Sequence, residues 1–483
     1  MKLARKIYLV ITVILILSFN AAAQPVATRL DSLMRALYTR GQFNGGILVS
    51  AGGKKVYEGC YGKANLQTNA DFTATTPCYL ASVSKQFTAM AIMMLREQKL
   101  LNYDDPVTKY FPELSPYAYD VTIRHLLNHT SGIVNYENLG IDGPGLSNSK
   151  VFDRLVKEKF LRFTPGDKYE YSNSGYVLLA MIVAKVSGMS FAEFIGKYIF
   201  TPLGMKISFI LDSSTAHKSR ATGYGKFGEV SDNVGFTVGD GGICSTVDDL
   251  DRWDVALYGD QLISQAALHE AFSPAVLNNG TTAPYGFGWM LKIENNDPVA
   301  YHTGGSGGFR TYIGRNLKKH ISIIILTNIE NSPRTEISHA IANILENKPY
   351  VLPRMSVAVQ MFDIVNKKGI DSAISFYNIC KRKNQTAYNF DEQELNLLGY
   401  KLWSINKLTE AIAVFKLNVM AYPKSSNTYE SLGEAYLKQG DRQQAEEDFK
   451  TSLKLDPQNE DAIRMLKKIN GPQYNIPKAK NIH

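Results

Sequence analysis

The sequence predicts an α/β (α+β) domain with a helical insert, followed by an all-α domain. Strand-like runs occur early, at 46–62, and late, at 285–291, 310–314 and 321–326, with mostly helical and loop sequence between them. This order indicates one sheet built from both ends of a domain. Beyond Pro349 a 34-residue period replaces the strand-like pattern and indicates stacked helices.

The first elements follow from local patterns. Residues 26–40 predict an amphipathic helix, and 46–62 predict a hairpin that turns at Gly52-Gly53. The continuous β-branched run at 321–326 predicts a central strand. A helix over 335–346 should close this domain.

The N-terminus has the pattern of a signal peptide. A basic stretch (Lys2, Arg5, Lys6) precedes an apolar run at 7–19 and the small-residue sequence Ala21-Ala22-Ala23. The run is shorter than the ~20 residues that a membrane span needs, so cleavage is favoured over an uncleaved anchor. We therefore expect an exported protein, periplasmic or secreted, with no membrane span after signal cleavage.

Composition excludes some partners and leaves the redox state open. Removing residues 1–23 takes three basic residues from a formal net charge of +8, and no dense Lys/Arg run remains, so nucleic acid is not expected as a partner. The four cysteines are too widely spaced for a disulfide framework or a zinc pattern. A Cys60–Cys78 bridge and buried free thiols both stay open.

The C-terminal part repeats itself at four positions: Gly399/Gly433, Ala411/Ala445, Phe415/Phe449 and Pro423/Pro457. This pattern resembles the tetratricopeptide repeat, and the alternative is a helical spacer. A degenerate copy around Ala373 and Tyr377 and a capping helix over 460–470 would complete the stack. The resemblance implies a possible protein partner.

The predicted domain boundaries follow from these patterns. They are a signal peptide at 1–23, a catalytic domain at 24–347, a helical linker or degenerate repeat at 348–390, repeats with the capping helix at 391–472, and a tail at 473–483.

The stretch Ser82-Val83-Ser84-Lys85 carries the first chemical signal. It places a hydroxyl and an amine three residues apart at the start of an apolar helical run, and such residues share one helix face. An adjacent unprotonated amine can take the proton of a serine nucleophile. Alone, this S-x-x-K pattern is common.

Two further motifs follow in order, Tyr171-Ser172-Asn173 and His302-Thr303-Gly304-Gly305. The ordered set resembles the penicillin-recognising serine hydrolases of the class C β-lactamase type, which include D-alanyl-D-alanine carboxypeptidases, D-aminopeptidases and esterases. The resemblance covers about 42–346. It implies a serine β-lactamase-like fold, with an antiparallel sheet flanked by helices and a helical subdomain.

The resemblance also implies roles. Ser82 would form an acyl-enzyme, Lys85 would help deprotonate it, and Tyr171, partly ionised beside Lys85, would shuttle the proton. Asn173 would bind the substrate amide or fix Lys85. The backbone N–H groups of Ser82 and Gly305 would form the oxyanion hole. His302, Thr303 and Gly304 would line the cleft and let substrate approach.

One departure narrows the expected activity. Many β-lactamases of this type carry Lys where His302 stands, and a histidine is mostly neutral at pH 7. We therefore expect a carboxypeptidase-like peptidase or an esterase acting on a small-molecule or peptide substrate, with cell-wall fragments as one candidate source. Arg310 is a weaker candidate for a carboxylate contact. A true β-lactamase and a catalytically weak scaffold whose repeats bind a protein are the alternatives.

Three other patterns compete with these motifs. Ser231-Asp232-Asn233 spells the class A β-lactamase triplet but sits in loop-like sequence. Residues 304–308 satisfy G-x-S-x-G without the required helix after the turn, so they indicate a flexible cleft edge. His125 and His129 have zinc-ligand spacing without a third ligand, so helix-end packing is favoured, and no metal or cofactor is expected.

Overall fold

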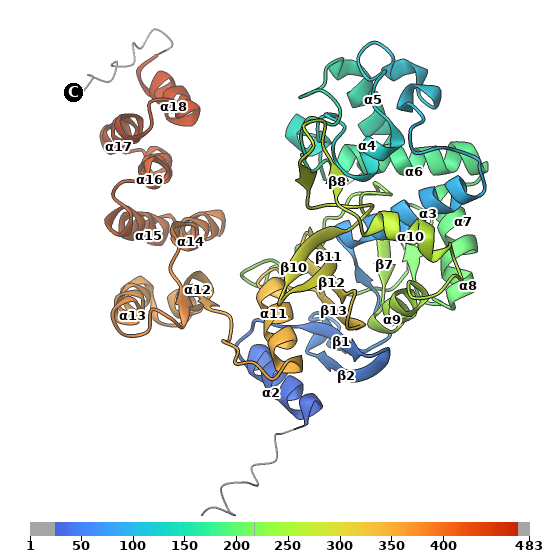
Figure 1. Ribbon diagram of the computed structural model, residues 1–483. Coiled ribbons are helices and arrows are strands. Elements are labelled where there is room, and N and C mark those ends of the chain that lie inside the picture. The colour runs from blue at the N-terminus through green and yellow to red at the C-terminus, as the bar shows by residue number, and fades with distance from the viewer. Residues whose placement is uncertain (1–24, 144, 217, 472–483) are drawn as a thin grey trace, which may run out of the picture. The chain divides into compact units, whose positions relative to one another are not determined.

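The computed structural model describes residues 25–143, 145–216 and 218–471, and its contacts divide the chain into two compact units at the Leu352–Pro353 boundary (Figure 1). The predicted signal peptide (1–23) and tail (473–483) lie outside the described residues.

The first unit is built on a six-stranded antiparallel sheet in the order β10-β11-β12-β13-β1-β2. The early hairpin and the late strands therefore share one sheet, as the sequence predicts, and β13 is internal. Gly52 and Gly53 turn the hairpin with φ of +58° and +73°, a conformation that favours glycine. The strands are β1 (Gly45–Ala51), β2 (Lys54–Tyr61), β10 (Met290–Glu294), β11 (Asp297–Ser306), β12 (Phe309–Asn316) and β13 (Ile321–Thr327).

Side-chain alternation in the sheet creates two cores. Ile47 and Val49 of β1 pack with the buried faces of α2 (Val26–Thr39) and α11 (Arg334–Leu345), whereas Leu48 points into the larger core on the other side. This is the period of two that a strand requires. Both predicted terminal helices are thus present, and they lie together on one face of the sheet (Figure 1).

The strand predicted over 285–291 is the main difference in the sheet. Only its last two residues belong to β10, and Tyr285 forms a single bridge with Met290. Gly288, with φ of +79°, breaks the extended conformation. The predicted flexible edge at 304–308 is also partly ordered, because Gly304, Gly305 and Ser306 end strand β11.

The other face of the sheet carries helix α3 (Lys85–Glu97), which is buried from Lys85 to Leu95 and packs against α6 (Asn173–Ser187). In the part of the chain that is described, no single helix is long and apolar enough to cross a membrane. One pair of helices, 173–187 and 191–203, is long and apolar enough only when both are counted together, and the pair is bent at its break. The remaining helices of this unit are α4 (Ile123–Leu127), α5 (Asn148–Glu158), α7 (Phe191–Ile195), α8 (Thr201–Leu203), α9 (Val247–Ala256) and α10 (Gln265–Ala271).

Short strands complete the first unit, and β7 pairs with both β5 and β6 behind the start of α3. They are β3 (Lys63–Asn65), β4 (Ala70–Asp71), β5 (Cys78–Tyr79), β6 (Phe209–Ile210), β7 (Ile243–Ser245), β8 (Ala275–Val276) and β9 (Thr282–Ala283). All four cysteines are free thiols, so the Cys60–Cys78 bridge is not formed.

The second unit consists of helices in sequence, with a short pair of strands, β14 (Met355–Ser356) and β15 (Tyr388–Asn389). A Cβ on Gly399 would come within 2.4 Å of the Phe415 ring, so the repeated small residue lets neighbouring helices approach. The predicted capping helix is α18. The helices are α12 (Val357–Lys368), α13 (Ile370–Lys383), α14 (Glu392–Ser404), α15 (Leu408–Ala421), α16 (Ser426–Gln439), α17 (Arg442–Leu455) and α18 (Glu460–Asn470).

Candidate active site

Ser82 lies in a 3-10 turn (Ala81–Ser84) that leads directly into α3, and it lines a cavity of about 620 Å³. Ala81 holds a φ of +49°, a conformation that costs a non-glycine residue about 1–3 kcal/mol and occurs at functional sites. Two hydrogen bonds fix the backbone just before it: the Leu80 carbonyl accepts from Thr311 Oγ1 at 2.7 Å, and the Leu80 N–H donates to the Ile243 carbonyl at 2.8 Å.

Lys85 connects Ser82, the candidate nucleophile, to two other segments. Its Nζ donates to Ser82 Oγ at 3.2 Å, to Asn173 Oδ1 at 2.8 Å and to the Asp240 carbonyl at 2.7 Å. Burial lowers the pKa of Lys85 to about 8, while the charges of Asp240 and Glu137 act in the opposite direction. About a tenth of the amine is therefore neutral at pH 7 and able to accept the proton of Ser82.

Tyr171 is placed as predicted but is in a different protonation state. Lys85 Nζ lies 4.9 Å from the centre of its ring. Burial raises the pKa of Tyr171 well above its ordinary value, and the neighbouring Ser82 hydroxyl opposes this shift only in part. The expectation of partial ionisation is wrong, because a phenolate loses more solvation in this buried position than Lys85 returns. Among the described residues no hydrogen bond of the phenol hydroxyl has standard geometry, but the Ser82 hydroxyl is close enough to act on its pKa, which places the phenol proton beside Ser82.

Asn173 begins helix α6, and one hydrogen bond of its backbone and one of its side chain fix its position. Its N–H donates to Asn135 Oδ1 at 3.1 Å, while its side chain accepts from Lys85. Of the two expected roles, fixing Lys85 is the one this contact supports. Asn173 also lines the cavity, so the other expected role, binding the substrate amide, stays a prediction.

His302 does not line the cleft, and this expectation from the sequence is wrong. Its side chain is fully buried, with Nε2 2.9 Å from the Tyr285 hydroxyl and Nδ1 2.8 Å from the Thr303 carbonyl. Burial lowers the pKa of His302 to about 3, with a further contribution from Lys85. It is therefore a neutral packing residue behind Tyr171, at a ring-centre distance of 6.3 Å.

The glycines after His302 divide into two roles. A Cβ on Gly304 would lie 2.1 Å from the Leu80 carbonyl, so this glycine allows β11 to pack against the turn that carries Ser82. Neither Thr303 nor Gly304 is among the residues that line the cavity, whereas Gly305 is, together with Ser82. The pairing of Ser82 and Gly305 required for the expected oxyanion hole is therefore possible in this cavity.

His129 and Asp240 are parts of the site that the sequence motifs did not assign. The Nδ1 atom of His129 accepts from the Ser172 N–H at 3.2 Å, and its ring lies 4.3 Å from that of Tyr171. Its pKa is far below the ordinary value because it is buried, with a smaller effect from Lys85. His125 instead caps α4 through Nδ1. In the described ranges no group of three potential metal ligands occurs.

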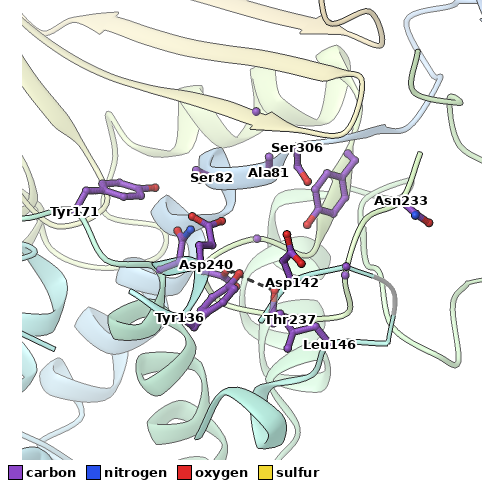
Figure 2. A pocket seen from close by; sticks show the side chains of 17 residues that line it. Ala81, Ser82, Tyr136, Asp142, Leu146, Tyr171, Asn233, Thr237, Asp240 and Ser306 are labelled. Carbon is purple, nitrogen blue, oxygen red and sulfur yellow. Dashed lines mark hydrogen bonds between the residues drawn. The ribbon is translucent and has the colours of Figure 1, made fainter. Parts of the chain in front are cut away.

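Asp240 precedes the Gly241-Gly242 pair and could have been noticed there as a charged residue beside a glycine turn. Its carbonyl accepts from Lys85, and its carboxylate accepts from the Tyr136 hydroxyl at 2.8 Å. Figure 2 shows Asp240 and Tyr136 in the cavity that Ser82 and Tyr171 also line.

The other sequence patterns, the Ser231-Asp232-Asn233 triplet, Arg310 and the G-x-S-x-G match, do not supply the residues around Ser82 and Lys85. Asp232 forms an ion pair with Arg220 at 2.7 Å, although Asn233 reaches the cavity wall. Arg310 pairs with Glu330 at 2.9 Å and does not line the cavity. Gly307 and Gly308 form the turn of the β11–β12 hairpin, so the G-x-S-x-G match is no nucleophile turn.

A serine in contact with a buried lysine amine, with a tyrosine and an asparagine beside them, defines a serine hydrolase. The chain belongs to the beta-lactamase family, whose model matches residues 30–347, and a tetratricopeptide repeat model matches 426–459. The predicted fold class and repeat are thus confirmed.

Three relatives illustrate the range of the family. A penicillin-binding protein of Bacillus subtilis is 36% identical over 373 residues, covering 71% of this chain and 80% of that protein. A D-aminopeptidase of Brucella anthropi is 27% identical, covering 65% and 62%. The solved octameric penicillin-binding protein homologue from Pyrococcus abyssi is 28% identical, with a TM-score of 0.59 and coverage of 71% and 81%.

Proposed function

We propose that this protein is an exported serine hydrolase that forms an acyl-enzyme on Ser82 and acts as a carboxypeptidase-like peptidase or an esterase. The main support is that Lys85 donates hydrogen bonds to Ser82, to Asn173 and to the Asp240 carbonyl. Export is supported by the signal-peptide pattern of residues 1–23.

The first chemical step uses the neutral form of Lys85. Its amine takes the Ser82 proton while Oγ attacks the substrate carbonyl, and the negative charge develops on the carbonyl oxygen. When the tetrahedral intermediate collapses, the leaving group needs a proton. Tyr171 is protonated and can donate it, and the Lys85 ammonium can restore the phenol. Water then hydrolyses the acyl-enzyme by the same steps in reverse.

The proposed preference for uncharged substrates follows from the charges of His302 and Arg310. His302 is buried and neutral, and Arg310 is held by Glu330, so neither offers a positive charge to a substrate carboxylate. This supports faster turnover of uncharged esters than of β-lactams, whose carboxylate would find no partner there.

The test compares p-nitrophenyl acetate and nitrocefin on the full chain and on Ser82→Ala, with intact-protein mass spectrometry for the acyl-enzyme. We expect ester turnover that is lost in Ser82→Ala, and a mass increase on the wild-type chain only. Nitrocefin turnover as fast as ester turnover would favour the β-lactamase alternative. Absence of both labelling and ester turnover would favour the scaffold alternative.

A further inference from the structure

We propose that the cavity in front of Ser82 selects substrates that carry a protonated amine next to the scissile carbonyl. The inference rests on the proposed acyl transfer at Ser82 and specifies its substrate class.

The described residues that line the cavity include three carboxylates, Glu137, Asp142 and Asp240, and no lysine or arginine. Figure 2 shows Asp142 and Asp240 in the wall of the same cavity as Ser82. Lys85 lies behind the nucleophile and is not part of the lining. Even with Lys85 fully charged, the formal charge around the cavity is negative, which attracts cations and repels anions.

Among these carboxylates, Asp240 is buried and has a hydrogen-bond acceptor without a donor among the described residues. Its side chain is only 6% exposed. Its Oδ2 accepts from the Tyr136 hydroxyl at 2.8 Å, but within the described chain Oδ1 accepts no hydrogen bond. A buried carboxylate oxygen without a donor is costly, so an ammonium group from the substrate would relieve it.

The position of Asp240 fits an amine close to the reacting bond. Lys85 Nζ bonds both Ser82 Oγ at 3.2 Å and the Asp240 carbonyl at 2.7 Å. The backbone of Asp240 is therefore joined to Ser82 through a single amine, and the Asp240 side chain lines the same cavity as Ser82. Glu137 and Asp142 are exposed, so they add long-range attraction at the mouth of the cavity, which salt would screen.

This arrangement divides the proposed activities. Recognition of a substrate's terminal carboxylate would need a cation that the described lining does not offer. A free amino group on the acyl residue, as in an amino acid amide or ester, matches the carboxylates instead.

The experiment uses three alanine p-nitroanilides, with a free amine, an N-acetyl group or an N-succinyl group, each as both enantiomers, on the full chain at pH 7. We expect kcat/KM to fall from free amine to acetyl to succinyl, by at least about tenfold overall. The preference should shrink in 0.5 M salt, about the concentration at which exposed charges are screened. Equal rates, or a preference for the succinyl substrate, would overturn the inference.

Variants separate substrate binding from tuning of Lys85. Asp240→Asn also removes a charge that raises the pKa of Lys85, so the readout is the ratio of free-amine to acetyl kcat/KM, which should fall at least about fivefold. Equal loss on both substrates would mean that Asp240 only tunes Lys85, and would overturn the inference. Glu137→Gln with Asp142→Asn, at exposed positions, should lower the same ratio without affecting folding.

Asp104→Asn is the matched control, because Asp104 is exposed and lies outside the lining; its ratio should equal that of the wild type. Hydrolysis of p-nitrophenyl acetate distinguishes the two proposals. If it does not exceed that of Ser82→Ala, the proposed function fails, and if it does while amine preference is absent, only the present inference fails.

Discussion

Lys85 Nζ lies 2.8 Å from Asn173 Oδ1, so one hydrogen bond joins the first residue of α3 to the first residue of α6. Both helix starts are buried. The amine is therefore held in place by a neutral acceptor that adds no negative charge, and its pKa can fall with burial.

The pH dependence of catalysis should follow Lys85. Its pKa is lowered from 10.5 to about 8, so the neutral amine increases about tenfold per pH unit below 8. We expect kcat/KM for a neutral ester to rise with pH and level off near pH 8.

The same lysine affects stability. Between about pH 8 and 10.5 the unfolded chain binds more protons at Lys85 than the folded chain does, so the contribution of Lys85 to the free energy of unfolding rises with pH in this window.

Replacing Asn173 by aspartate should move that profile. A carboxylate at 2.8 Å from the amine favours the charged lysine, so the rise in kcat/KM should shift to higher pH by about one unit or more. Asn69→Asp, which adds the same charge on the exposed surface, should leave the profile in place. An unshifted profile in Asn173→Asp would contradict the assignment of Lys85 as the base.

Tyr171→Phe should lower kcat while the substrate still binds. Loss of a positioned proton donor typically costs about 10²–10⁴ in rate, and phenylalanine keeps the ring packing against His129. Steady-state kinetics on an anilide should show a fall in kcat of at least about 100-fold with little change in KM. Tyr169→Phe, at a neighbouring ring outside the cavity lining, is the control. Equal rates for the two variants would show that Tyr171 only packs.

The ion pair between Arg315 and Asp254 should be important for stability. The two side chains are 1% and 4% exposed and 2.6 Å apart. Asp254→Asn leaves the Arg315 charge buried without its counter-ion, so we expect a loss of about 3–5 kcal/mol in the free energy of unfolding. Urea titration measures it. Asp104→Asn, in the exposed pair with Arg124, should cost less than about 1 kcal/mol, and similar losses for both would refute the argument.

The small residue of the repeats can be tested in the second unit. A Cβ on Gly399 would lie 2.4 Å from the buried Phe415 ring, whereas the equivalent Cβ on Gly433 would lie 3.1 Å from Phe449. We expect Gly399→Ala to destabilise the helices by about 1–3 kcal/mol and Gly433→Ala to cost less. Far-UV circular dichroism during urea unfolding gives the comparison. A stabilised Gly399→Ala would show that helix propensity outweighs the clash.

Local sequence patterns predicted most of the elements that carry the site. The Gly52-Gly53 turn in 46–62 and the continuous β-branched run at 321–326 placed β1, β2 and β13 correctly, because turn glycines and β-branched side chains favour these conformations locally. The prediction of a strand at 285–291 was wrong for most of that segment. Its apolar residues are compatible with a strand or a loop, and the positive φ of Gly288 interrupts the extended backbone. A pattern of apolar residues does not show where a single residue interrupts the strand.

The sequence by itself indicated Ser82 as the candidate nucleophile and Lys85 as its neighbour, because the two are close in the chain, and the order of the three motifs indicated the family that the comparisons show. Only the tertiary structure decided which motif residues line the cavity. His302 is turned into the core and Asp240 into the cavity, because the direction of a side chain depends on packing between segments far apart in sequence. Protonation was decided in the same way: burial, which no local pattern records, gives Lys85 its low pKa and keeps Tyr171 a phenol.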